Sequence, residues 1–346
     1  MADSEKAELV LGKLEKPNEG GKRQRWPIWI KLAITSAVVL AVIATTRHCG
    51  KGGNEINSIT RRSSDRRDST WRPAPGAEWQ ILLNNPLDMS VDLSPNVDIY
   101  DLDLYENPAE TVNALKAKGK HVICYFSAGT YESWRSDAAE FKEEDKGNIL
   151  PDWKGEQWLR LSSPGVRKIM AERVKLAASK GCEAIDPDNV DGYNNDNGIG
   201  LTESDSISFL SFLKEEASKY NMALGLKNAG EIVPNVLGIV DFCVQESCAA
   251  NSQGCTAFTP FIDAGKPVFR IEYPPGIPSI APEDAQNVCG AQGAQGFSTV
   301  LKNLDLNGWV QYCNGQVFNS NEIKVGKLAD KYAAAEVDGG GDDADS

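Results

Sequence analysis

The sequence is poor in histidine and lacks the spaced cysteine and histidine motifs that hold zinc. Only His48 and His121 occur in 346 residues. A histidine-dependent catalytic triad or a histidine-rich metal site is therefore not expected. No glycine-rich phosphate loop follows the first expected strand, which disfavours a nucleotide-binding sheet. The acid and base groups that remain for chemistry are carboxylates.

Positive charge is also scarce in most of the chain. The protein has 49 Asp and Glu against 36 Lys and Arg, a net charge of −13. Because residues 1–76 are net basic, the acidic excess lies entirely in residues 77–346. So acidic a domain would repel nucleic acid, whose phosphates carry the same sign, and would attract a cationic partner.

The sequence has one long hydrophobic run, residues 26–46, which is apolar apart from Lys31. Its length suits a membrane-spanning helix. Basic residues precede it, namely Lys22, Arg23 and Arg25. This flank favours a cytoplasmic N-terminal tail, residues 1–25, and hence a single-pass type II signal anchor in the cell membrane with an extracellular catalytic domain. Cleavage of the run as a signal peptide, which would give a secreted protein, is the alternative.

The composition divides the remainder of the chain into three parts. Residues 47–76 are rich in Gly, Ser, Asn, Arg and Asp, which predicts a disordered basic stalk. Residues 336–346 predict an acidic disordered tail. The segment between them, 77–335, is the expected folded domain, which we take to be a monomeric ectodomain.

All eight cysteines follow the hydrophobic run, so the predicted topology places them in an oxidising compartment. Cys248 and Cys255 are close enough to close one loop, and Cys289 with Cys313 could tie the last helix to the C-terminal region. Three others fall in or beside expected strands, where they could pair or stay buried as thiols: Cys124, Cys182 and Cys243.

Short apolar runs alternate with amphipathic stretches from Glu78 onward. Strands are expected at 78–84, 97–103, 121–127, 183–189, 222–228, 242–247, 267–273 and 297–303. Helices are expected at 108–118, 164–180, 204–219, 255–264 and 281–292. Eight strands that alternate with helices predict an α/β fold, a (β/α)8 TIM barrel, with a doubly wound sheet as the alternative.

The segment 184–193, AIDPDNVDGY, is the most informative stretch. It begins as a strand and holds three aspartates within six residues. Residues two apart in a strand share a face, so Asp186 and Asp188 point the same way. Carboxylates gathered there repel one another, which favours an acid/base or nucleophile site over a structural role. A calcium-binding or helix-capping loop is the alternative.

A barrel predicts polar residues at the carboxyl ends of its strands, where active sites of this fold lie. The sequence has them at Asp101, Asp103, Tyr125, Ser127, Asp186, Asp188, Lys227, Asn228, Glu246, Arg270, Glu272 and Lys302. Two carboxylates are the minimum for cleaving a glycosidic bond, and Asp188 and Glu246 are the best placed pair. Lys227 and Arg270 could hold one carboxylate ionised. Tyr125, Trp134, Tyr193 and Tyr273 offer faces for sugar rings.

Several ordered blocks resemble one enzyme family. They are WQILLN (79–84), DIYDLD (98–103), CYFSAGTYESWR (124–135), GCEAIDPDNVDGY (181–193), GLKN (225–228) and VQESC (244–248). These blocks are similar to glycoside hydrolase family 114, above all its fungal endo-α-1,4-polygalactosaminidases. The resemblance implies a (β/α)8 barrel that hydrolyses α-1,4-linked galactosamine polymers without a cofactor or metal. It also implies Asp188 and Glu246 as catalytic carboxylates, with Asn189, Asp191 and Tyr193 shaping the sugar site.

The expected substrate explains the acidity, since de-N-acetylated galactosamine carries an ammonium group. We expect the residues that bind this group to be among Asp101, Asp103, Asp186 and Asp191. The leading hypothesis is a surface-anchored endo-hydrolase of a galactosamine-containing exopolysaccharide of a fungal cell wall or biofilm. An inactive polysaccharide-binding barrel and a hydrolase of another α-linked polymer are the alternatives. We favour Asp188 as nucleophile and Glu246 as acid/base, with the reversed roles as the alternative. We also favour retention, although retention or inversion depends on the separation of the two carboxylates.

Overall fold

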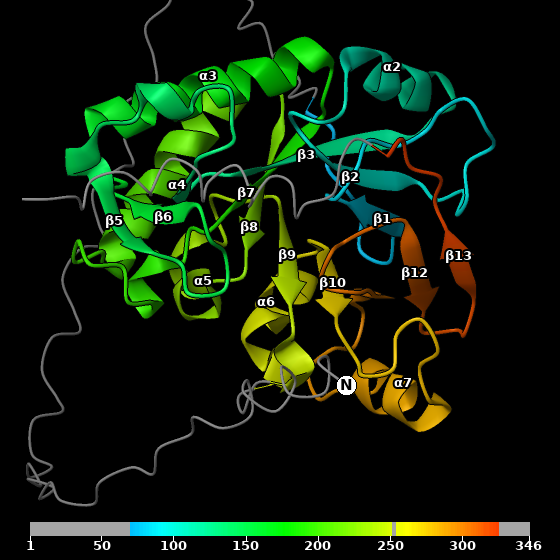
Figure 1. Cartoon of the computed structure of the whole chain (residues 1–346). Helices are drawn as coiled ribbons and strands as arrows, with labels where there is room; N and C mark the ends of the chain where they lie inside the picture. Colours follow the sequence, from blue (N-terminus) through cyan, green and yellow to red (C-terminus); the bar gives the residue numbers. More distant parts are fainter. Residues whose placement is uncertain (1–69, 251–253, 325–346) are drawn as a thin grey trace, which may run out of the picture. The chain divides into compact units, whose positions relative to one another are not determined.

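Eight parallel strands follow one another around a curled sheet, and two antiparallel strands extend it (Figure 1). The computed structural model describes residues 70–250 and 254–324. The parallel strands are β1 (Trp79–Leu82), β2 (Ile99–Asp103), β3 (His121–Ser127), β7 (Ala184–Asp188), β8 (Ala223–Lys227), β9 (Phe242–Glu246), β10 (Val268–Glu272) and β11 (Ser298–Leu301). Each pairs with the next in this order, and β12 (Trp309–Tyr312) and β13 (Val317–Asn319) follow β11. All eight expected strands are confirmed.

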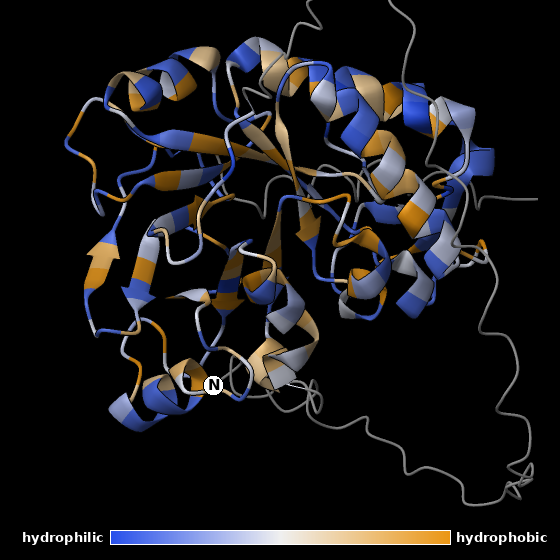
Figure 2. Ribbon diagram, turned by 180° about the vertical axis from the view of Figure 1, so that it is seen from behind, coloured by the Kyte–Doolittle hydropathy of each residue, from blue (hydrophilic) through white to orange (hydrophobic). Residues whose placement is uncertain are grey.

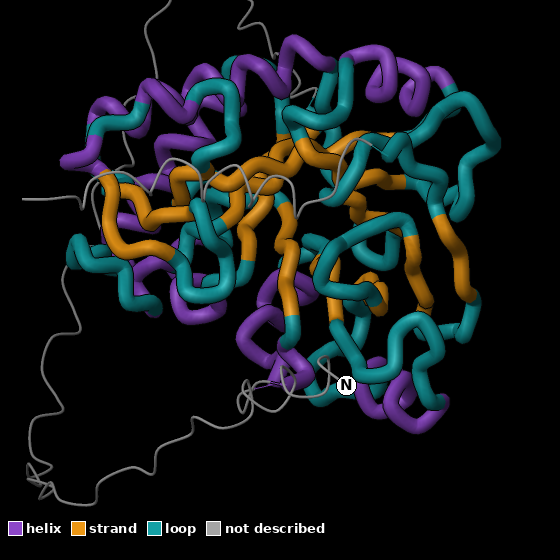
Figure 3. Tube along the Cα trace, in the orientation of Figure 1, coloured by secondary structure: helices purple, strands orange, loops and turns teal. Residues whose placement is uncertain are grey.

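Helices lie on the outside of the sheet, with the strands in the interior (Figure 3). They are α2 (Ala109–Ala117), α3 (Pro164–Lys180), α4 (Glu203–Ser218), α5 (Val233–Val236), α6 (Thr259–Asp263) and α7 (Pro282–Cys289). Local chemistry sets the ends of α3: the Ser163 side chain accepts from the backbone of Gly165 and Val166, and Gly181 ends the helix at φ 92°. The short α5 was not expected, and the expected helix 255–264 is split between a 3₁₀ turn and α6.

Alternation along the strands separates two hydrophobic layers. Figure 2 shows hydrophobic and hydrophilic residues alternating along several strands. Inward-facing side chains form one buried cluster that includes Trp79, Ile99, Ile123, Phe242, Phe269 and Val300. The outward-facing apolar side chains pack beneath the helices in a second, larger cluster. The sheet therefore encloses a filled core, as barrels of this type do.

The curled sheet is closed between β1 and β11 by side chains. In the described part of the chain no strand pairing joins these two strands. The Trp79 indole N–H donates to the Ser298 carbonyl oxygen at 2.9 Å, and the Lys302 ammonium donates to the Ile81 carbonyl oxygen at 2.8 Å. Lys302, expected from sequence among the site residues, is fully buried in this seam. The architecture is thus a TIM-like barrel with one side-chain seam.

A small antiparallel sheet between β3 and α3 was not predicted. It consists of β4 (Thr130–Glu132), β6 (Glu156–Leu159) and β5 (Lys146–Ile149), in that order. Its strands have three or four residues and show no regular apolar alternation, so the sequence carried little signal for them. This inserted sheet rises from the carboxyl end of β3, where it can wall an active site.

The expected tail, membrane anchor and most of the stalk lie outside the described residues, as does the acidic C-terminal segment. Within residues 70–250 and 254–324, no helix is long and apolar enough to span a bilayer. Two residues assigned from sequence to the stalk contact the barrel. Trp71 stacks on His121 with ring centroids 4.2 Å apart, and Arg72 pairs with Asp241 at 2.9 Å.

Three disulfides cross-link the described residues. Cys248–Cys255 and Cys289–Cys313 are the pairs that the sequence favoured. The third, Cys124–Cys182, joins β3 to the segment before β7. Cys243, in β9, is a buried thiol.

Candidate active site

A cavity of about 490 Å³ opens at the carboxyl ends of the parallel strands. Ten of the residues expected at the site line it: Asp103, Tyr125, Trp134, Asp188, Asn189, Asp191, Lys227, Asn228, Glu246 and Tyr273. Apart from Trp134 and Tyr273, they come from β2, β3, β7, β8 and β9 or the turns that follow, so the parallel sheet gathers residues up to 143 positions apart. The remaining wall comes from the inserted sheet and the loop after β11.

Lys227 lies between the two carboxylates expected to be catalytic. Its ammonium is 3.0 Å from Asp188 Oδ1 and 2.7 Å from Glu246 Oε2. Burial disfavours the charged form, but the carboxylates of Asp188 and Glu246 outweigh it and raise the pKa of Lys227 well above its usual value. A fixed positive charge therefore joins the two carboxylates.

Asp188 accepts hydrogen bonds from three sides. The Tyr125 hydroxyl donates to Oδ2 at 2.7 Å, while the Lys227 ammonium and the Asn189 backbone N–H reach Oδ1 at 3.0 and 2.7 Å. Asn189 holds the turn with a positive φ of 61°, a conformation that asparagine tolerates better than most residues. Three donors hold the carboxylate in place and leave it little freedom to rotate.

Glu246 is more open. Its side chain is 23% exposed, against 15% for Asp188. The Tyr273 hydroxyl donates to Oε1, and the Asn228 amide lies 3.5 Å from Oε2. Asn228 also accepts from the Glu246 backbone N–H at 2.9 Å, which fixes the end of β9. The longer, more exposed side chain suits a group that must exchange protons.

Asp103 lines the cavity but is already paired. The Arg135 guanidinium makes two hydrogen bonds to Asp103, at 3.1 and 2.7 Å, and two to Glu132, at 2.8 and 2.9 Å. All three side chains are about 95% buried. One arginine thus joins the end of β2 to the inserted sheet, and Asp103 acts first as a structural partner of Arg135.

Acidic groups dominate the cavity. The carboxylic side chains that line it are Asp103, Glu132, Asp152, Glu156, Asp188, Asp191, Asp196, Glu246 and Asp305. Arg135 and Lys227 are the basic side chains of the same wall. Burial, followed by the nearby Asp188, raises the pKa of Asp191 to about 6. A cation that enters this cavity is therefore stabilised.

Asp101 and Asp186 lie in the barrel core, below the cavity, and do not line it. Both are fully buried, and no N–H or O–H group in the described residues donates to their four carboxyl oxygens. The hydrogen bond that each of these carboxyl groups can form is with the other carboxyl group of the pair. Burial raises the pKa of Asp186 to about 8 and that of Asp101 well above its usual value. The pair therefore retains at least one proton.

The structure also corrects the expected positions of three other residues. Arg270 and Glu272 point outward because Phe269 and Ile271 occupy the inward face of β10. They form an ion pair with each other at 3.0 Å, and both are at least 97% buried outside the cavity. The Tyr193 hydroxyl donates to Glu231 at 3.1 Å and likewise lies off the cavity wall.

Sequence reasoning missed much of the wall that the inserted sheet provides. Arg135, Trp153, Glu156 and Trp158 line the cavity from this segment, beside Trp134, which was expected to offer a face to sugars. The available signal was the length of the connection from 128 to 163, which exceeds an ordinary strand-to-helix loop and is rich in tryptophan.

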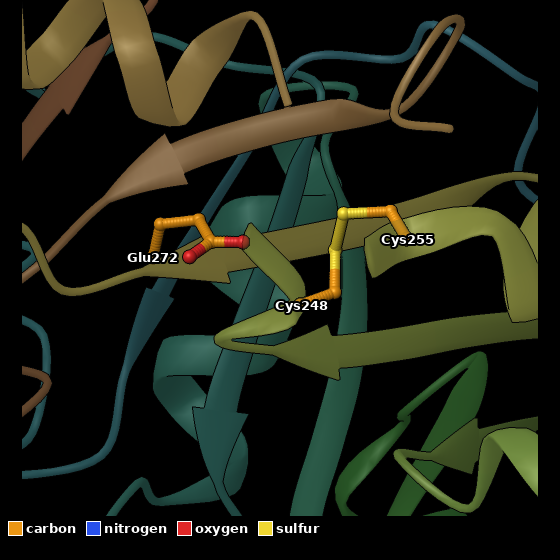
Figure 4. Close-up of side chains that lie close together, drawn as sticks. All are labelled: Cys248, Cys255 and Glu272. Carbon is orange, nitrogen blue, oxygen red and sulfur yellow. A yellow bond between two sulfur atoms is a disulfide. The ribbon is translucent and has the colours of Figure 1, made fainter. Parts of the chain in front are cut away.

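One group in the described residues has the spacing of a metal site. Cys248, Cys255 and Glu272 present ligand atoms within 4.8 Å of one another. Figure 4 shows the two sulfurs bonded to each other, with the Glu272 carboxylate directed towards that loop. Disulfide sulfurs cannot act as thiolate ligands, and Glu272 instead accepts from the Ala249 backbone N–H at 2.9 Å. The group fixes the loop after β9.

Two carboxylates at the open end of a TIM-like barrel, joined by a buried lysine in a sugar-sized cavity, define a glycoside hydrolase. The comparisons with known proteins specify the family. The family model for glycoside hydrolase family GH114 matches residues 60–318, and the chain belongs to this family.

Solved structures agree with this assignment. Ega3 from Aspergillus fumigatus, in a complex with galactosamine, is 48% identical over 70% of this chain and 97% of its own, with a TM-score of 0.67. A variant of the glycoside hydrolase domain of PelA from Pseudomonas aeruginosa is 15% identical over 66% of this chain and 95% of its own, with a TM-score of 0.50. The second likeness shows the fold alone. No curated protein sequence matches the chain.

Proposed function

We propose that this glycoside hydrolase cleaves internal α-1,4 linkages of a galactosamine-containing polysaccharide, with Asp188 and Glu246 as its catalytic pair. The observation that carries the proposal is the lysine-bridged carboxylate pair within an acidic cavity. The galactosamine complex of the 48% identical Ega3 supports the choice of sugar. An unacetylated galactosamine polymer is cationic, and its charge complements the wall.

The distances favour retention of configuration. Because one ammonium contacts both carboxylates at 3.0 and 2.7 Å, the two contacting oxygens lie no farther apart than the sum of these distances. Retaining enzymes place their carboxyl groups roughly 5–5.5 Å apart, and inverting enzymes roughly 6.5–9.5 Å apart. This upper limit applies to the nearer oxygens of the two carboxyl groups, and it lies below the inverting range. We therefore assign a two-step, retaining reaction.

In the first step Asp188 Oδ2 or Oδ1 attacks the anomeric carbon while protonated Glu246 gives its proton to the departing glycosidic oxygen. In the second step Glu246 takes a proton from water, the water oxygen bonds to the anomeric carbon, and Asp188 leaves as a carboxylate. The three donors around Asp188 suit the nucleophile, and the greater exposure of Glu246 suits proton exchange with solvent.

The test is cleavage of a deacetylated α-1,4-galactosamine polymer by the full-length chain. We expect oligosaccharide products of mixed length, with the α anomer formed first. Asp188→Asn and Glu246→Gln should lower kcat by at least a thousandfold and still bind the polymer, whereas the exposed Asp98→Asn serves as the matched control. Polymer binding without cleavage by the unsubstituted chain would favour an inactive binding barrel. Cleavage of a different α-linked polymer in its place would reassign the substrate.

Residues 26–46 support a proposal about location. We propose that they anchor the chain as a type II membrane protein with an extracellular barrel, in agreement with the three disulfides. Expression in intact fungal cells with protease added outside tests it. Digestion of the barrel with retention of the N-terminal tail in the membrane fraction is expected. Release of a barrel that starts after residue 46 would show cleavage and secretion.

A further inference from the structure

Glu156 is a buried carboxylic acid of the cavity wall. It lies in β6, lines the cavity and is 8% exposed. No Lys, Arg or His nitrogen of the described residues forms an ion pair with it. By contrast, Arg135 forms ion pairs with Asp103 and Glu132, and Lys227 forms ion pairs with Asp188 and Glu246. A buried carboxylate without a counter-ion is unfavourable until a cation arrives.

The position of Glu156 is fixed from one side only. The Thr130 hydroxyl donates to Oε2 at 2.9 Å, and the Asn189 amide donates to the Thr130 oxygen at 3.1 Å. This chain of hydrogen bonds runs from the residue after Asp188 to the inserted sheet. Among the described residues, the hydrogen bond from Thr130 to Oε2 is the one that the Glu156 carboxyl accepts, which leaves Oε1, its second oxygen, without a donor there. One oxygen is thus held in place, and the other is free for a ligand beside the nucleophile.

The surroundings disfavour the ionised form of Glu156 in the empty cavity. Burial and then the Glu132 carboxylate, which lies directly opposite on β4, raise the pKa of Glu156 to about 8. The carboxylate of Asp188 on β7 raises this pKa further, while the hydrogen bond from Thr130 and the charge of Arg135 lower it. The Tyr125 phenol on β3 also faces the Glu156 carboxyl group. In mildly acidic solution the side chain therefore carries a proton that a bound cation would displace.

We propose that Glu156 recognises the protonated amine of a galactosamine unit by forming an ion pair with it next to Asp188. The inference rests on the proposed function and names the side chain that selects the deacetylated sugar. An N-acetyl group carries no charge, so it offers nothing to offset the burial of the carboxylate. Specificity for deacetylated units thus comes from a wall residue of the inserted sheet and is separate from the catalytic pair.

The test compares binding of two oligosaccharides of equal length, deacetylated and fully N-acetylated, to full-length chains that carry Glu246→Gln to prevent cleavage. The variants are Glu246→Gln alone, with Glu156→Gln, and with Glu144→Gln as the matched control. Gln keeps the size of Glu156 and can still accept from Thr130, and Glu144 is an exposed acid of the same inserted segment. Titration calorimetry near pH 6, in buffers of different ionisation enthalpy, counts released protons.

With Glu156 present we expect a proton to be released on binding the deacetylated sugar and none on binding the N-acetylated one. Glu156→Gln should abolish the release and reduce the preference for the deacetylated sugar about tenfold or more, while Glu144→Gln changes neither. Unchanged preference and proton release in Glu156→Gln would overturn the inference, and so would an equal loss for both sugars. If the unsubstituted chain cleaves no galactosamine polymer, the proposed function fails first, and this inference fails with it.

Discussion

Replacement of Asp186 by asparagine is expected to stabilise the protein at alkaline pH. Asp186 is fully buried, and in the described part of the chain no group other than Asp101 offers it a hydrogen bond. Its pKa is about 8 in the folded protein, against 3.8 for an ordinary aspartate. Because the pKa of Asp186 is higher in the folded protein than in the unfolded chain, the contribution of this side chain to the free energy of unfolding is most favourable below about pH 4. That contribution is lost as the pH rises towards 8.

The size of this effect follows from the shift. At about 1.4 kcal/mol for each pKa unit, moving from 3.8 to about 8 costs the folded state on the order of 5 kcal/mol at alkaline pH. Asparagine has no charge to bury, and its amide N–H can donate to Asp101. Part of the gain in stability is offset because the asparagine amide is also a buried polar group. We expect Asp186→Asn to raise the free energy of unfolding by about 2–3 kcal/mol near pH 8.

Urea denaturation of the full-length chain near pH 4.5 and pH 8 measures the effect. Asp186→Asn should differ little from the unsubstituted chain at the lower pH and should be clearly more stable at the higher one. Asp98→Asn makes the same chemical change at an exposed position and should have no effect at either pH. Equal or lower stability of Asp186→Asn near pH 8 would refute the reasoning about the buried acid pair.

Three further outcomes follow from the contacts of the site and the cross-links. Lys227→Met should lower kcat by at least a hundredfold in steady-state assays, because two close carboxylates lose their shared counter-ion; activity within tenfold of the original would contradict the bridge. Tyr125→Phe removes one donor from Asp188 and should reduce kcat about tenfold with little change in KM, and an effect on KM alone would argue for a role in binding. The double replacement Cys124→Ser and Cys182→Ser opens a loop of 58 residues and should lower the free energy of unfolding by about 4 kcal/mol in urea denaturation, whereas an unchanged midpoint would indicate a cross-link that does not constrain the unfolded chain.

The alternation of strands and helices was readable because its signals are local. Largely apolar runs of six or seven residues marked all eight parallel strands. Glycines with positive φ follow three of the helices, at Gly119, Gly181 and Gly265. The two-residue period of a strand also indicates which face each side chain occupies. In the segment 268–273, Phe269 and Ile271 already indicate that Arg270 and Glu272 share the opposite face.

Other features had no local signal. The strands of the inserted sheet are too short to show a period, and their pairing depends on residues 8 to 28 positions apart. The local sequence likewise does not indicate how deeply a polar residue lies within the barrel. Asp186 and Asp188 point to the same interior, yet one lies in the dry core and the other in the cavity. Their burial depends on neighbouring strands that are distant in sequence.

The sequence by itself determined the order of the elements, the acidic character of the domain and the two carboxylates, since each depends on residue type or short-range spacing. Only the tertiary structure decided which acids have a counter-ion. Lys227 joins Asp188 to Glu246, Arg135 pairs with Asp103, and Glu156 has no counter-ion among the described residues. Charge pairing is set by distances of 3–4 Å between side chains from different strands, and such distances exist only once the sheet has curled.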